Sequence, residues 1–359
     1  MTTSISGTGG ITFPDGSVQP AAASPYVNKN RIINGDFRID QRNAGASVTS
    51  GFPVDRFQVY STQSSKWTAQ QSTTAPTGFT NSVIITSSSS YSPISSDYFS
   101  YTTRIEGFNV ADLDWGTANA KTITVSFWVR SSLTGTWTGA LHNNAFNRVY
   151  PFSYTISSAN TWEYKTVTIA GDTTGTWLTN NSVGIEIGFA FSVGSSGLGT
   201  AGAWTNTASI FGATGQTNLL GTNGATFYIT GVQLEQNTSA TPFERRLYNQ
   251  ELANCKRYYQ KTYEIGTALG TNTNTGAISV FYNGTYGAAN GFRFETEMRA
   301  SPTLTGYSVG GTSGQWSIIA GATNTVTFGD LGSKGMRYIQ VTSGGSVGYE
   351  GHYSASAEL

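Results

Sequence analysis

Three tryptophans lie where they could contact a sugar. Trp137, Trp177 and Trp204 each occur in a segment rich in Gly, Thr and Asn. The C–H faces of pyranose rings stack on indole rings, and Asn, Asp and Thr side chains can hydrogen-bond the hydroxyls. An indole exposed in such a loop is costly apolar surface, so several together would mark a contact patch. The alternative role for each tryptophan is packing beneath its own loop.

Other side chains join these tryptophans as candidates. His142 and Asn144 follow Trp137 closely, and the C-terminal region offers further aromatic residues. For His142 the alternative is a merely solvated loop histidine. The candidate glycan contacts are therefore Trp137, His142, Asn144, Trp177, Trp204, Tyr282 and Trp316.

Acidic residues offer little catalytic chemistry. Hydrolysis of a glycan needs two carboxyl groups that converge in a cleft. Asp112 and Asp114 come nearest, because in an extended chain they point the same way. Their like charges would then raise the pKa of one of them, or both would bind calcium; a solvated loop is the alternative. No zinc-protease, serine-hydrolase, phosphate-loop or dinucleotide motif occurs, so we expect no catalysis.

Asp36, within the segment 34–37, is a further candidate for holding a cation. This segment begins with Asn-Gly, the commonest hairpin turn, so a turn that ties the first strand to the last is the favoured interpretation. We expect no cofactor, and a structural calcium at Asp36, Asp112 or Asp114 stays open.

Composition excludes several classes of protein. The 359 residues have a formal net charge of zero, which argues against a nucleic-acid binder, because such a protein needs a basic face to neutralise phosphates. Only 11% of the residues are charged whereas 13% are aromatic, which predicts a folded β protein. Cys255 is the only cysteine, so no intrachain disulfide can form. The N-terminus does not read as a signal peptide, and no apolar run is long enough for a membrane-spanning helix.

Residues 1–29 are predicted to form an arm. They contain few apolar residues, and Ile11 and Phe13 lead into a turn that starts at Pro14 and Asp15. A floppy tail and a segment that folds only on a partner both fit this composition.

Residues 30–240 are predicted to form a long antiparallel β region. Segments 121–130 and 183–193 alternate between apolar and small or polar side chains, which is typical of strands with one buried face. Many strands with long polar connections favour a jelly-roll sandwich. Further strands are predicted around residues 57–60, 82–86, 164–169 and 227–234.

The segment 241–266 carries the strongest helix signal. Thr241 can cap the helix, Pro242 suits the first helical position, Glu244 completes a capping box, and Gly266 can end the helix.

Four residues of this segment are spaced like a heptad seam: Tyr248, Leu252, Cys255 and Tyr259. One interpretation is an amphipathic helix packed on its own domain. The other is a seam shared between identical chains, too short to trimerise alone but able to assist flanking domains.

Residues 267–359 are predicted to form a small second β-sandwich. Residues 292–299 alternate between apolar and charged side chains, and 336–345 and 347–359 supply closing strands. The expected fold class is thus all-β: an N-terminal arm, a jelly-roll sandwich, one connecting α-helix and a small C-terminal β-sandwich.

Several motifs are similar to those of phage proteins. NKNRIINGDFRIDQRN at 28–43, FYITGVQLEQNTSATPFERR at 227–246 and ELANCKRYYQK at 251–261 resemble a widespread tail-fibre domain, whose jelly roll is similar to carbohydrate-binding modules. EMRASPTLT at 297–305 and the ending ASAEL look like the domain that often follows. GGITFPDGS at 9–17 is similar to short repeats at the N-termini of phage fibres.

The resemblance implies a homotrimeric tail fibre or spike, made in the host cytoplasm and carried on the virion. It would bind a host surface glycan or outer-membrane receptor without catalysis, and the arm would attach to another virion protein. The anchor residues would be Ile11, Phe13, Pro14 and Asp15, and the trimer seam would be Tyr248, Leu252, Cys255 and Tyr259. The alternatives are a virion-associated glycan hydrolase (depolymerase) and a structural head-decoration or adaptor protein.

Overall fold

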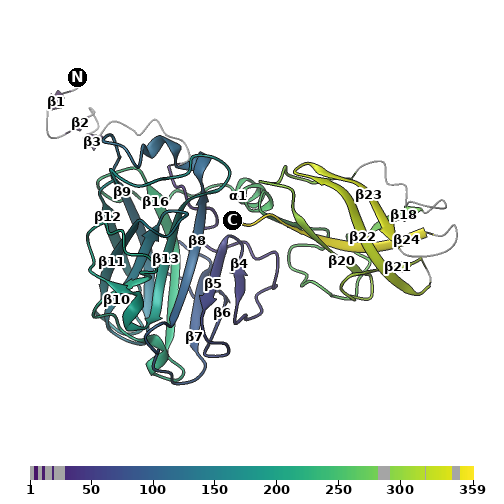
Figure 1. Cartoon of the computed structure of the whole chain (residues 1–359), viewed down its shortest axis with the longest axis horizontal. Helices are drawn as coiled ribbons and strands as arrows, with labels where there is room; N and C mark the ends of the chain where they lie inside the picture. Colours follow the sequence, from purple (N-terminus) through teal and green to yellow (C-terminus); the bar gives the residue numbers. More distant parts are fainter. Residues whose placement is uncertain are drawn as a thin grey trace.

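Two β units lie side by side in the computed structural model, with the short helix α1 (Tyr248–Lys256) between them (Figure 1). The structure describes residues 29–281, 292–319, 321–341 and 348–359, together with the backbone of 4–6, 10–12 and 18–19. The larger unit is a jelly roll, and the smaller one is called the C-terminal unit below. This arrangement confirms the all-β class with one connecting α-helix. Within the described ranges, no helix is long and apolar enough to cross a membrane.

The jelly roll contains two antiparallel sheets whose neighbouring strands are mostly distant in sequence. One sheet has, in spatial order, β11 (Val149–Ile156), β10 (Gly135–His142), β13 (Val183–Val193), β8 (Tyr98–Glu106), β5 (Phe57–Ser61) and β4 (Gly51–Val54). The other has β12 (Glu163–Ile169), β9 (Ile123–Ser131), β16 (Thr226–Glu235), β7 (Ser82–Ser87) and β6 (Trp67–Ser72).

Alternating side chains build the core between these sheets, as the sequence predicts. On β9 the inward face carries Ile123, Val125, Phe127 and Val129, all fully buried. The strand β13 differs from expectation, because its second face is buried as well. The segment that contains β15 (Gly212–Ala213) packs on that face, which explains the small residues there.

Several short strands and 3-10 turns lie outside the two sheets of the jelly roll. β1 (Ser4–Ser6), β2 (Gly10–Thr12) and β3 (Val18–Gln19) form a three-stranded sheet, and β14 (Leu198–Gly199) pairs in parallel with β15. Among the residues that the structure describes, four 3-10 turns occur: η1 (Gly107–Asn109), η2 (Ala111–Leu113), η3 (Ser195–Gly197) and η4 (Leu219–Gly221).

The predicted turn at Asn34–Gly35 ties the entrance of the jelly roll to β16. The side-chain amide of Asn34 donates to the carbonyl oxygens of Ile39 at 2.8 Å and Asp55 at 3.0 Å. The carbonyl of Gly35 accepts the N–H of Val232 at 2.8 Å. A Cβ atom on Gly35 would lie 2.1 Å from the Val232 carbonyl oxygen, so the close approach requires glycine.

The helix is shorter than the segment 241–266 predicted from the sequence. It begins after Leu247, so the predicted cap at Thr241 does not start it. Instead, the Thr241 hydroxyl donates to Glu235 at 2.7 Å. Residues Tyr259–Lys261 form the strand β17, so the C-terminal sheet begins within the predicted helix.

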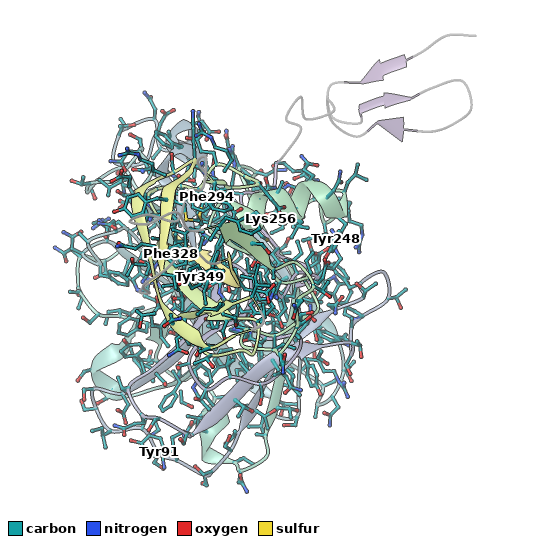
Figure 2. All side chains as sticks on the ribbon, turned by 90° about the vertical axis from the view of Figure 1, so that its right-hand side faces the viewer. Tyr91, Tyr248, Lys256, Phe294, Phe328 and Tyr349 are labelled. Carbon is teal, nitrogen blue, oxygen red and sulfur yellow. The ribbon has the colours of Figure 1, made fainter. Side chains whose placement is uncertain are left out.

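The C-terminal unit is an eight-stranded sheet with its own apolar core. Its central strand is β24 (Gly348–Ser356), which pairs with β17, β18 (Ile278–Phe281), β20 (Thr303–Ser308) and β21 (Gln315–Ile318). The remaining strands are β19 (Phe292–Arg293), β22 (Thr323–Gly332) and β23 (Gly335–Val341). Figure 2 shows Phe294, Phe328 and Tyr349 together within this unit, and Tyr248 on α1 at the edge of the molecule.

Charged side chains join the two units at their junction. Glu358, which follows β24, pairs with Arg42 at 2.8 Å and also with Arg56 of the jelly roll. Arg257 binds Glu106 with two hydrogen bonds of 3.0 and 2.7 Å. Because these groups are largely withdrawn from water, the pairs fix how the units sit against each other.

Candidate functional site

Three tryptophans from separate connections meet at one end of the jelly roll. The ring centroids of Trp115 and Trp177 lie 4.7 Å apart, those of Trp115 and Trp204 5.4 Å, and those of Trp177 and Trp204 5.5 Å. All three contacts are edge-to-face, the arrangement that the aromatic quadrupole favours. Trp115 is 8% exposed, whereas Trp177 and Trp204 are half-buried. The structure thus unites two predicted contacts, Trp177 and Trp204, with one that the sequence analysis missed.

Backbone carbonyls hold the three indoles in place. Trp115 donates its indole N–H to Lys121 at 2.8 Å, Trp204 donates to Ala170 at 2.8 Å, and Trp177 donates to Thr174 at 3.2 Å. The N–H groups are therefore already satisfied, and the ring surfaces are what remains for a ligand.

An ion pair supports the loop that carries Trp177. Arg148 binds both carboxylate oxygens of Asp172 at 2.7 Å, and this hydrogen-bonded pairing raises the pKa of Arg148. The Arg148 guanidinium also lies 5.9 Å from the centre of the Trp204 ring. Such a forked, partly buried contact orders the loop more firmly than a single exposed pair would.

A groove of about 160 Å³ opens beside Trp115 and Trp177. This tryptophan groove combines apolar surface with polar side chains, the mixture found in ligand sites. Its lining includes Val110, Ala111, Asp114, Thr117, Leu178 and Thr179. Such a lining can stack one face of a sugar ring and hydrogen-bond its hydroxyl groups.

Three other predicted contacts are buried, so the expectation that they lie on exposed loops was wrong. Trp137 lies in β10 and Trp316 in β21, both with 0% exposure, and the Trp316 indole N–H donates to the His352 carbonyl at 2.9 Å. His142 is 1% exposed at the end of β10, and burial lowers its pKa. These residues stabilise cores because the surrounding Gly- and Thr-rich sequences form strands.

Two predicted contacts have other outcomes. Asn144 is exposed in the turn after β10 and does not belong to the lining of the tryptophan groove. Tyr282 lies outside the described residues.

Of the predicted virion anchor, Ile11 belongs to β2, whereas Phe13, Pro14 and Asp15 lie outside the described residues.

The candidate metal ligands each have a basic partner. Asp36 contacts Arg38 at 2.5 Å, Asp112 contacts Arg31 at 2.6 Å, and Asp114 contacts Lys121 at 3.1 Å. Burial raises the pKa of Asp36, although Arg38 opposes this effect. Among the described residues, no group of three or more His, Cys, Asp or Glu side chains could hold a metal ion.

The four predicted seam residues do not share one exposed face. Cys255 and Tyr259 are buried within their own chain, Leu252 is half-buried, and Tyr248 is 43% exposed. Arg42 stacks on the Tyr259 ring at 3.7 Å, so that side chain belongs to the junction. Packing within the same chain therefore accounts for Cys255 on α1 and for Tyr259 on β17.

A second aromatic surface was missed by the sequence analysis. On the outer face of β9 and β12, Trp128 lies directly opposite Tyr164, with centroids 5.3 Å apart. On the same face Tyr228 lies 6.1 Å from Trp162 and 5.1 Å from the Arg130 guanidinium. We call these aromatic residues the sheet-face cluster. The available signal was the outward position of Trp128 in the alternating segment 121–130.

The sequence matches no known family model and no curated protein. Solved structures with a similar fold include the enzymatically active domain of bacteriophage CBA120 tailspike protein 4, with 13% identity, a TM-score of 0.33, and coverage of 58% of this chain but 22% of that one. TmCBM61, solved with β-1,4-galactotriose, has 10% identity and a TM-score of 0.30. The match covers 58% of this chain and 99% of that one. The CBM22 tandem of Paenibacillus barcinonensis Xyn10C has 15% identity and a TM-score of 0.31. The match covers 60% of this chain and 52% of that one. All three TM-scores lie below 0.5, so function has to be argued from the site itself.

Proposed function

We propose that this chain is a non-catalytic, glycan-binding attachment protein of a phage particle, a tail fibre or spike that works as a homotrimer. The motifs around residues 28–43 and 227–246, which resemble a tail-fibre domain, support the phage assignment. In the fold these two segments meet, because Gly35 bonds to Val232.

The observation that carries the glycan proposal is the tryptophan groove. Trp177 presents ring surface next to hydroxyl and carboxylate side chains, including Thr117 and Asp114. A sugar ring needs both, since one of its faces is apolar and its edge carries hydroxyls. Asp114 and Asp112 pair with Lys121 and Arg31, which suits binding better than the proton transfer of a hydrolase.

A printed array of bacterial polysaccharides and lipopolysaccharide glycans tests the proposal. The native chain should bind at least one of them, and Trp177→Ala should weaken that binding by tenfold or more. Tyr164→Ala, which removes an exposed ring of the sheet-face cluster, is the matched control and should bind as the native chain does. Absence of binding to every glycan contradicts the proposal; loss only in Tyr164→Ala would move the site to the sheet face.

Two further measurements separate the alternatives. Light scattering should give a mass three times 38.2 kDa, and a monomer at micromolar concentration would contradict the trimer. Incubation with the bound polysaccharide should release no new reducing ends. Release that disappears in Asp114→Asn would instead establish a hydrolase.

A further inference from the structure

A second hollow adjoins the 3-10 turn η1, whose last residue directly precedes two residues that line the tryptophan groove. It has a volume of about 220 Å³ and lies between residues 30–33, η1 and α1. Its polar lining is Asn30, Arg31, Asn109, Arg246, Gln250 and Asn254. We call it the amide hollow.

The floor of the amide hollow is rigid and already hydrogen-bonded. The side-chain oxygen of Asn30 accepts the N–H groups of Ile32 at 2.9 Å and Leu234 at 3.1 Å. Arg246 donates to the Ile32 carbonyl at 3.0 Å and to Glu251 at 3.1 Å. A ligand would therefore meet a preformed surface, which lowers the entropy lost on binding.

The rim of the hollow has free hydrogen-bonding capacity. The side chains of Asn109 and Gln250 are exposed and make no hydrogen bond to any described residue. Each amide offers two donors and one acceptor oxygen, which matches hydroxyl groups that both donate and accept. Arg31 is paired with Asp112 and Arg246 with Glu251, so the hollow carries no unpaired charge among these groups. This chemistry suits a neutral polyhydroxylated ligand.

The amide hollow and the tryptophan groove meet at consecutive residues. Asn109 lines the hollow, and Val110 and Ala111 line the groove. Adjacent Cα atoms are about 3.8 Å apart, so the linings of the two sites share one short turn. A chain of sugars stacked on Trp177 would reach the hollow with its next residues.

We infer that the two hollows are neighbouring subsites for one neutral oligosaccharide, which crosses the turn at Asn109–Val110. The groove stacks one sugar ring, and the amide hollow hydrogen-bonds the hydroxyls of another. This inference rests on the proposed function and adds the ligand class: an uncharged oligosaccharide of at least two residues.

Calorimetry with oligosaccharides of one to six residues, released from the polysaccharide that the array identifies, tests the inference. Affinity for the native chain should rise by tenfold or more between the single sugar and the length that spans both hollows. The double variant Asn109→Ala/Gln250→Ala should lower affinity for the longer ligands about tenfold, because two or so hydrogen bonds are lost, and leave the single sugar unaffected. Asn249→Ala, an exposed amide on the same helix outside the hollow, is the matched control and should change nothing.

The outcomes distinguish the two proposals. If the double variant binds every length as the native chain does, the amide hollow is not a subsite, while loss of binding in Trp177→Ala still supports the proposed function. An affinity independent of ligand length also overturns the inference. If no array glycan binds, the proposed function fails and the inference fails with it.

Discussion

The tetrapeptide Thr-Gly-Thr-Trp occurs twice in the jelly roll and has two different structures. At residues 134–137 it enters the strand β10, and its tryptophan is fully buried against Phe227. At 174–177 it lies in a connection, and its tryptophan lines the tryptophan groove. The same four residues thus belong to a core strand in one place and to a surface connection in the other, because the residues around them decide whether a strand forms.

Removing the two indoles should give the largest difference between the copies. Trp137→Ala leaves a cavity in the core and should cost about 3 to 5 kcal/mol of unfolding free energy. Trp177→Ala should cost clearly less, since its ring is only half-buried, but should weaken glycan binding by tenfold or more. Denaturant titration and array binding, measured on both variants, check this. Equal losses of stability would show that the two indoles are equally part of the core.

Alanine in place of the glycine of each Thr-Gly-Thr-Trp copy should lower stability in both copies but affect glycan binding in only one. Gly135 has φ 128° and Gly175 φ 79°, so alanine in either position is strained and should cost about 1 to 3 kcal/mol. A Cβ on Gly175 would lie 2.4 Å from Cγ of Arg148, which is held by Asp172.

Gly175→Ala should therefore also disturb the loop of the groove and weaken glycan binding several-fold. Gly135→Ala, whose Cβ would meet only the Thr217 side chain, should bind normally. The check is thermal melting together with binding for both variants. Normal binding by Gly175→Ala would show that Arg148 does not position the groove.

The smallest expected difference is a pH dependence of folding stability that comes from His142, at the end of β10. Burial lowers the pKa of His142, and the Ile210 carbonyl lies 2.6 Å from its ring nitrogen. The unfolded chain takes up this proton near pH 6.5 while the folded chain resists it, so stability should fall as the pH drops below that value. Replacing His142 by Gln should flatten this decline between pH 7 and pH 5, measured by denaturant midpoints; an unchanged slope would contradict the assignment.

Much of the fold could be predicted because period-two alternation is a local property. The segments 121–130 and 183–193 became β9 and β13, and the turn at Asn34–Gly35 binds β16. The role of each tryptophan could not be predicted in the same way. Trp137 is followed by residues that continue a strand, whereas Trp177 is followed by Leu178 and then by the polar run 179–182, which does not. The three residues before each tryptophan are identical, so they do not reveal this difference.

Long-range pairing explains the other failures. The residues Tyr259–Lys261 continue a plausible helix pattern, but they are drawn into a sheet by β24, nearly a hundred positions later. Trp115 and Trp177 come from separate connections, so neither spacing nor composition could show that they share a groove. The sheet-face cluster was hidden for the same reason, since it needs the register of β9 against β12.

The central position of β24 has a consequence for the order of folding during synthesis. This strand is translated after the other strands of its sheet, yet four of them pair with it. The jelly roll can therefore fold on the ribosome before β17, β18, β20 and β21 can pair with β24. A nascent chain stopped before residue 348 would carry one finished unit and one without its organising strand, and quality-control proteases would be expected to digest the second.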